Sequence, residues 1–259
     1  EMLWCADPAV WNRHAPILFP YAGKLTGGHF LAEDGKVYEG GQHGFARDLE
    51  HQLVSQTANE LTFELTSGEE TYAYFPYDFA LRSTYTLEGR RISHSVAVRN
   101  TGKGTLRFGF GYHPGFALPF DDAHTAEDYD VVFDTVESPL CLNTAPNGLV
   151  CASPDYYLAR NVDRIPLSAK LFAHDSHCMV NLKSKTMSVV ERDTGRRIVV
   201  DIADFPYTLI WSTPQEPMRF ICIEPWHSIP SEDNGPIEWE KKPCAASLAL
   251  DEMWQTTLN

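Results

Sequence analysis

Short runs that alternate apolar and polar residues recur along this chain, and they constrain its fold more than any other feature. The runs occupy positions 61–65, 79–87, 92–98 and 106–112 and are rich in aromatic and β-branched residues. Successive side chains of a β-strand point to opposite faces of a sheet, so a period of two predicts a strand with one buried face. We therefore expect a β-strand at each run.

Turn-forming residues between the runs indicate how the strands pair. Gly89 lies between two alternating runs, and Gly195 lies between MSVVER and RIVVDI. Because glycine readily adopts the positive φ of tight hairpin turns, we expect antiparallel neighbours at both places. No long segment has helical periodicity, and 17 glycines and 17 prolines interrupt the chain. The predicted fold class is all-β and mostly antiparallel.

Length and composition favour one domain spanning residues 1–259. The chain has 259 residues and is 43% hydrophobic, enough to bury a large core, and all-β sandwiches of this size commonly form a single domain. No apolar run reaches the roughly 18 residues that cross a bilayer, and the first residues lack the pattern of a signal peptide. We expect a cytoplasmic protein with no membrane partner.

The net charge and the cysteine content exclude several classes of partner and cofactor from the prediction. The net charge of −14 disfavours binding to nucleic acid, whose phosphates attract basic proteins. The six cysteines are scattered, with no CxxC pair and no zinc-ligand spacing, and they predict buried thiols rather than a metal site or a disulfide framework. We expect no metal ion and no cofactor.

Polar side chains that could carry chemistry stand in four kinked, mostly apolar stretches. In chain order these are WNRHAPILFPYAGKL, QHGFAR, FGYHPGFALP and FICIEPWHSIP. His113 ends an apolar strand before Pro114, and Glu224 follows a wholly apolar run before Pro225. Proline favours extended backbone in the residue before it, so both side chains have a restricted position. In the second stretch, the Gly44 turn would bring His43 and Arg47 near each other.

Each candidate also has a purely structural explanation. A single histidine at a strand end is commonly a hydrogen-bonded core or surface residue. Arg13 and Arg47 could form ion pairs near strand ends, and Trp211 and Trp226 could be core residues. The structural explanation is weaker for Glu224, because a buried carboxylate is costly unless it is paired or hydrogen-bonded.

The four stretches in this order, together with the opening LWCADPAVW, resemble the aldose 1-epimerase superfamily in its branch of galactose mutarotase-related proteins. The resemblance extends from Leu3 to the C-terminus. It implies a galactose mutarotase-like β-sandwich, or supersandwich, with a sugar bound across a concave sheet face. It also implies that one or two strands of the branch precede Glu1.

The resemblance implies a role for individual residues. His113 matches the general acid, Glu224 the general base, and His43 and Arg13 match sugar-binding residues. Asp175 matches the sugar-binding aspartate, with Asp201 and Asp204 as alternatives.

Mutarotation suits this set of residues because it needs only one acid and one base. A base removes the proton of the C1 hydroxyl while an acid protonates the ring oxygen, so the ring opens and recloses as the other anomer. We expect Glu224 to stay ionised beside a cationic neighbour. Trp226 would supply an aromatic platform for the sugar, and Arg47 could contribute to an anion site. The expected activity is that of an aldose 1-epimerase, an isomerase acting on a free aldohexose.

Other functions remain open on the sequence alone. HGFAR also resembles the hexose-6-phosphate mutarotases, although Asp48 beside Arg47 could neutralise a phosphate site. A non-catalytic carbohydrate-binding protein would share the sandwich, and a glycoside hydrolase would need a second carboxylate of comparable quality. His227 and Ser228 stand where the branch has a small turn and could reshape the cleft. A homodimer is compatible with the sequence.

Overall fold

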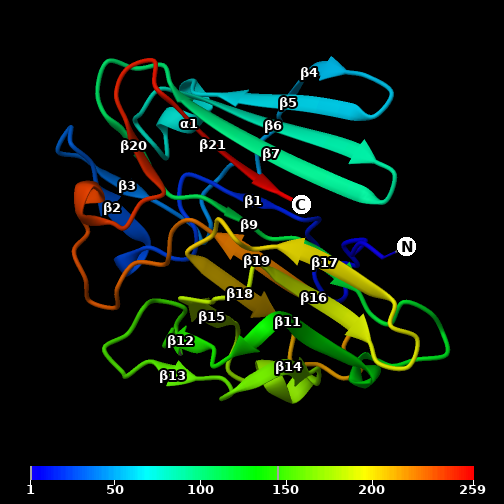
Figure 1. The fold of residues 1–259 in the computed structure, drawn as a ribbon. Helices are drawn as coiled ribbons and strands as arrows, with labels where there is room; N and C mark the ends of the chain where they lie inside the picture. Colours follow the sequence, from blue (N-terminus) through cyan, green and yellow to red (C-terminus); the bar gives the residue numbers. More distant parts are fainter. Residues whose placement is uncertain (1, 145) are drawn as a thin grey trace. The chain divides into compact units, whose positions relative to one another are not determined.

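The computed structural model describes residues 2–144 and 146–259, and it consists almost entirely of β-strands (Figure 1). The described helical segments are a single α-helical turn and four short 3₁₀ turns: α1 (Glu69–Tyr72), Thr26–Gly28, Ala126–Asp128, Ala169–Phe172 and Trp239–Lys241. The sheet ladders are antiparallel. The predicted all-β, mostly antiparallel fold class is confirmed. No described helix is long and apolar enough to cross a membrane.

The contacts between Cα atoms divide the chain into two compact units, each made of two separate segments. The first unit contains the residues up to Ile17 together with Gly111–His227, and the second contains Leu18–Phe110 and Ser228–Asn259. Strand β1 (Ile17–Leu18) lies at the boundary. The single domain expected from chain length stays a prediction.

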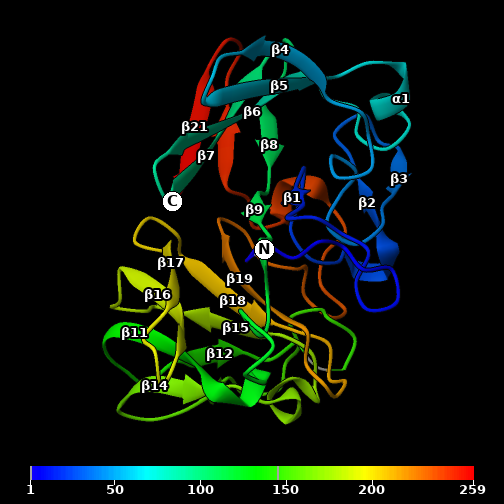
Figure 2. The same cartoon turned by 90° about the vertical axis from the view of Figure 1, so that its right-hand side faces the viewer.

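The first unit carries two sheets (Figure 2). In the larger sheet the order is β9-β19-β18-β15-β12-β13, and β10 also pairs with β19. The strands are β9 (Gly111–Tyr112), β10 (Gly115–Ala117), β12 (Leu140–Leu142), β13 (Tyr156–Tyr157), β15 (His177–Val180), β18 (Tyr207–Trp211) and β19 (Phe220–Trp226). The smaller sheet has the order β14-β11-β16-β17, with β11 (Tyr129–Glu137), β14 (Val162–Pro166), β16 (Thr186–Glu191) and β17 (Arg197–Asp201).

The second unit is built on a five-stranded sheet of order β21-β7-β6-β5-β4, in which β6 and β7 form a long hairpin (Figure 1). Its strands are β4 (Gln52–Gln56), β5 (Glu60–Thr66), β6 (Phe79–Glu88), β7 (Arg91–Asn100) and β21 (Met253–Leu258). Two smaller pairs accompany it: β2 (His29–Leu31) with β3 (Val37–Glu39), and β8 (Leu106–Phe108) with β20 (Ala246–Leu248).

The predicted hairpins are present, but one predicted strand is wrong. Strands β6 and β7 pair through the turn at Gly89, and β16 and β17 pair through the turn at Gly195. The run at 106–112 is two strands rather than one, because β8 pairs with β20 while β9 pairs with β19. The backbone N–H of Gly109, between them, donates to the carbonyl of Pro20 instead of joining either sheet.

Gly44 in the second unit occupies a position that only glycine fits. Its φ is +69°, and a Cβ built there would lie 2.1 Å from the carbonyl oxygen of Phe19. Phe19 itself is fully buried and has ring contacts with Phe45 and Phe79. A side chain at Gly44 would therefore push against the backbone that anchors the aromatic core of this unit.

We expect Gly44→Ala to lower the free energy of unfolding by more than about 2 kcal/mol, since it combines backbone strain with a steric clash. Gly35→Ala is the matched control, because Gly35 has a similar φ of +77° but no atom within 4 Å of the added Cβ. Its cost should be about 1 kcal/mol, from the positive φ alone. Urea unfolding measures both variants, and equal losses would contradict the predicted clash.

Candidate active site

Strand β19 brings the two predicted catalytic residues together by pairing with β9 and β10. Gly111 lies opposite Trp226 and Gly115 lies opposite Cys222. This register places His113, between the two short strands, directly opposite Glu224. Facing residues on neighbouring antiparallel strands have Cβ atoms roughly 5 Å apart, so their side chains can interact.

Prolines accompany both residues at a break in this ladder. Pro114 follows His113 in the gap between β9 and β10, and Pro225 lies within β19 after Glu224. Proline has no backbone N–H and is normally excluded from central strands. Here both prolines lie near the place where the pairing of β19 with β9 and β10 is interrupted. Glu224 is thus inside the buried strand, paired with Leu209 of β18, and not after its end as the sequence suggested.

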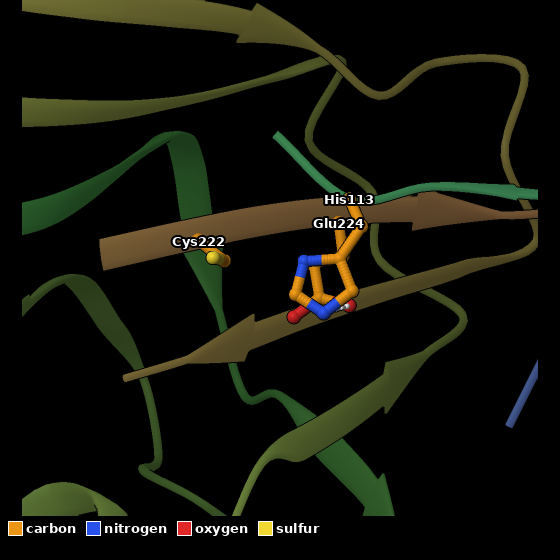
Figure 3. Close-up of side chains that lie close together, drawn as sticks. All are labelled: His113, Cys222 and Glu224. Atoms are coloured by element: carbon orange, nitrogen blue, oxygen red, sulfur yellow. Dashed lines mark ion pairs between the residues drawn. The ribbon is translucent and has the colours of Figure 1, made fainter. Parts of the chain in front are cut away.

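The side chains of His113 and Glu224 meet in the first unit. Nε2 of His113 lies 3.3 Å from Oε2 of Glu224, and both side chains are buried, with exposed fractions of 8% and 2%. Figure 3 shows the imidazole lying over the carboxylate, with Cys222 farther back along the same strand. The pair is close enough for a proton on either group to lie between them.

Burial controls the charge of Glu224. Loss of solvation raises the pKa of Glu224 well above its usual range, and the negative charge of Asp175 acts in the same direction. A hydrogen bond from the Trp226 side chain opposes this shift. Desolvation is the largest of these effects, and it opposes the ionised form that a cationic neighbour was expected to favour.

Aromatic rings surround His113. The indole of Trp11 stacks on the imidazole with ring centroids 5.0 Å apart and an interplanar angle of 28°. Trp211 approaches it edge to face at 5.7 Å and 87°. Sequence reasoning did not select Trp11 as a site residue, although it opens the stretch that contains Arg13. The sequence signal for Trp11 was that it lies in the same stretch as a predicted site residue.

Trp226 is a buried neighbour of the catalytic pair. Its side chain is 3% exposed, and its indole N–H donates to the carbonyl of Tyr112 at 3.1 Å. In this position it presents little surface to a ligand. Trp226 was the predicted aromatic platform for the sugar. Trp11 and Trp211 are more exposed than Trp226.

Asp175 is the aspartate that acts on Glu224. It lies in the loop before β15 with φ of +79°, it is exposed, and its carboxylate accepts the backbone N–H of Ser176 at 2.8 Å. Of the two alternatives, Asp204 acts on His227 electrostatically, and Asp201 accepts the N–H of Ala203. Of the three aspartates, Asp175 is the one with an electrostatic effect on Glu224, and its sugar-binding role stays a prediction.

Arg13 and His227 also belong to the first unit. Arg13 lies half-buried in the loop that follows Trp11. His227 packs against Phe205 at a centroid distance of 4.6 Å, and burial lowers its pKa to about 4. A neutral His227 is therefore expected near pH 7. Ser228 belongs to the second unit.

The second unit contains His43 and Arg47, and the Gly44 turn brings both onto Gln42. Nδ1 of His43 accepts the backbone N–H of Gly23 at 3.0 Å, and its Nε2 lies 3.1 Å from the side-chain nitrogen of Gln42. The guanidinium of Arg47 donates to the carbonyl of Gln42 at 2.8 Å. It also lies 3.7 Å from the carboxylate of Asp48.

Two groups of described residues offer donor atoms of the kinds that bind metal ions. His113, Cys222 and Glu224 hold their donor atoms within 4.8 Å of one another, and so do Asp121, His124 and Glu191. In the second group Arg196 contacts both carboxylates, so a cationic side chain already neutralises them. In the first group Cys222 packs in a core cluster with Trp4 and Phe220.

Comparison with known proteins identifies the family of this chain. A family model described as aldose 1-epimerase matches residues 1–235. The chromosomal protein LacX of Lactococcus lactis subsp. lactis is 33% identical over 258 residues, covering 97% of this chain and 86% of that protein. The galactose mutarotase related enzyme of Lactobacillus acidophilus has a TM-score of 0.93 at 30% identity, covering 100% of this chain and 85% of that one.

A galactose mutarotase-like protein from Lactobacillus casei ATCC 334 has a TM-score of 0.88 at 27% identity, covering 100% of this chain and 88% of that one. The fold, the order of the motifs and the matched length lead to one assignment. This chain belongs to the aldose 1-epimerase family.

Proposed function

We propose that this protein interconverts the α and β anomers of a free aldohexose by acid/base ring opening and reclosure. The observation that carries the proposal is the buried contact between His113 and Glu224. Family membership supplies the reaction class, and the pair supplies the proton donor and acceptor that the reaction needs.

The reaction proceeds in two symmetric halves. The Glu224 carboxylate takes the proton of the C1 hydroxyl, the bond between C1 and the ring oxygen breaks, and protonated His113 gives its proton to that oxygen. The open aldehyde then rotates about the C1–C2 bond. Reclosure reverses the proton transfers, so neither group is changed after a full cycle. An acid or a base placed within hydrogen-bond reach of the reacting atoms typically raises the reaction rate by a factor of about 10² to 10⁴.

The spacing of the pair suits this substrate. The hydroxyl oxygen and the ring oxygen are both bonded to C1, so an acid and a base must approach two neighbouring atoms. Side chains that are 3.3 Å apart in the unliganded protein can reach both atoms with small movements. The high pKa of buried Glu224 makes its carboxylate a stronger base than an exposed one.

The other predicted residues would bind the sugar. We propose that Arg13 and Asp175 of the first unit hydrogen-bond the hydroxyl groups, as the family resemblance implies, and the sugar-binding role of His43, in the second unit, stays a prediction. Trp226, two residues after Glu224 on β19, is proposed to line the sugar site. Arg47 already bonds Gln42 and neighbours Asp48, which favours a structural role over phosphate binding.

Glu224→Gln and His113→Asn should each lower kcat for anomeric exchange by about 10² to 10⁴, because each removes one proton-transfer group. Exchange NMR on a panel of free aldohexoses measures the rate. Glu137→Gln is the matched control, since Glu137 is a buried glutamate of the same unit whose carboxylate accepts the N–H groups of Lys183 and Ser184. Exchange that survives both catalytic substitutions would overturn the assignment. Sugar binding with exchange at the buffer rate would favour the carbohydrate-binding alternative.

The pH profile should reflect the raised pKa of Glu224. As pH falls, Glu224 takes up a proton while an ordinary glutamate is still ionised, and the protonated form cannot act as the base. We expect kcat/KM to decline with an apparent pKa well above the usual 4.5. A plateau that continues down to pH 4.5 would contradict this expectation.

Free and phosphorylated sugars should differ as substrates. Because the Arg47 guanidinium is engaged within its own loop, we expect a higher kcat/KM for a free hexose than for its 6-phosphate. The measurement compares the two by exchange NMR in the parent and in Arg47→Ala. A preference for the 6-phosphate that Arg47→Ala abolishes would establish the alternative, a hexose-6-phosphate mutarotase.

A further inference from the structure

Trp11 is the residue of the first unit that covers the ring of His113. The rings are nearly parallel, with centroids 5.0 Å apart. Such a distance is typical of an attractive aromatic contact. When the imidazole is protonated, the negative face of an indole attracts it further as a cation–π pair. Trp211, at an angle of 87° to the imidazole, closes a second side.

Hydrogen bonds hold Trp11 over His113. The indole N–H of Trp4 donates to the carbonyl of Trp11 at 2.8 Å, and the backbone N–H of Trp11 donates to the carbonyl of Asp7 at 2.9 Å. The backbone N–H of Trp4 donates in turn to the carbonyl of Gly115 at 2.9 Å. The segment that carries Trp11 is thus fastened to β10 two residues after His113.

Packing fixes the indole from two strands. Trp11 stacks on Phe220 of β19 at a centroid distance of 5.2 Å and an angle of 16°. On β10, a Cβ at Gly115 would lie 2.9 Å from the Trp11 ring, so the ring needs glycine at that position. Trp11 nevertheless stays partly exposed while Phe220 is fully buried. These contacts therefore fix the position of an indole that remains partly exposed.

We propose that Trp11 is a positioning residue that orients the His113 ring and stabilises its protonated, proton-donating form. The catalytic meaning of this inference rests on the proposed function, but the interaction itself does not. The contact supplies what a general acid needs: a fixed orientation of the ring and a favourable environment for the extra positive charge.

Other charged groups near His113 must be kept constant in the test. Glu224 and Cys222 of β19 lie beside the imidazole. On the segment that carries Trp11, Asp7 lies 3.9 Å from Arg219. None of these residues changes in the variants below, so a shift in the titration of His113 would come from the indole.

The experiment compares Trp11→Leu with Trp11→Phe. NMR titration of the His113 ring in the absence of sugar should give a pKa lower by about half a unit to one unit in Trp11→Leu. Trp11→Phe keeps an aromatic face and should retain most of the parent value. Because a lower pKa leaves less acid form near neutral pH, the alkaline limb of kcat/KM should move to lower pH by the same amount in Trp11→Leu.

A second measurement keeps the shape of the side chain. Fluorinated tryptophan incorporated at position 11 withdraws electrons from the ring face, and it should lower the pKa of His113 without a change in packing. Val10→Ala is the control, since Val10 packs on the same cluster. It should lower stability and leave the titration unchanged.

Two results would overturn the proposal: a His113 titration that is unchanged in both Trp11→Leu and the fluorinated protein, or equal titrations and rates for Trp11→Leu and Trp11→Phe. Failure of the proposed function has a different signature. In that case the parent protein shows no anomeric exchange, while the titration of His113 still responds to the indole.

Discussion

The candidate site depends on the antiparallel pairing of β19 with the two short strands β9 and β10. His113 and Glu224 are far apart in the sequence, and this register sets them opposite each other. Neither side chain reaches the other through a flexible loop; both project from neighbouring backbones. The pairing is interrupted between β9 and β10, where His113 and Pro114 lie. A rigid sheet thus fixes the distance between a proton donor and a proton acceptor.

Local patterns predicted most of the fold but not the partners of every strand. The period-two runs and the glycine turns gave the hairpins of β6 with β7 and of β16 with β17, since these contacts join residues close in sequence. The run at 106–112 looked like one strand because its hydrophobic pattern is continuous. Its halves pair with β20 and β19, whose positions depend on distant chain segments. Such non-local pairing leaves no signal in a short window.

The sequence predicted those site residues that are chemically reactive and also stand in a distinctive motif. His113 and Glu224 stood out because polar groups beside prolines interrupted apolar runs, and the structure brings them together. The role of Trp11 could not be read in the same way, because a tryptophan in a loop gains meaning only from the ring it contacts. The raised pKa of Glu224 is hidden from the sequence for a related reason, because the sequence does not show how completely the surrounding chain removes the carboxyl from water.

The burial of Glu224 makes the stability of the folded protein depend on pH. A folded-state pKa above the unfolded value means that the folded chain binds more protons, so this group's contribution to stability is full at low pH and lost as pH rises through the folded pKa. Once ionised, the buried Glu224 carboxylate therefore destabilises the folded state, and a sugar hydroxyl that donates a hydrogen bond to it would offset part of this cost.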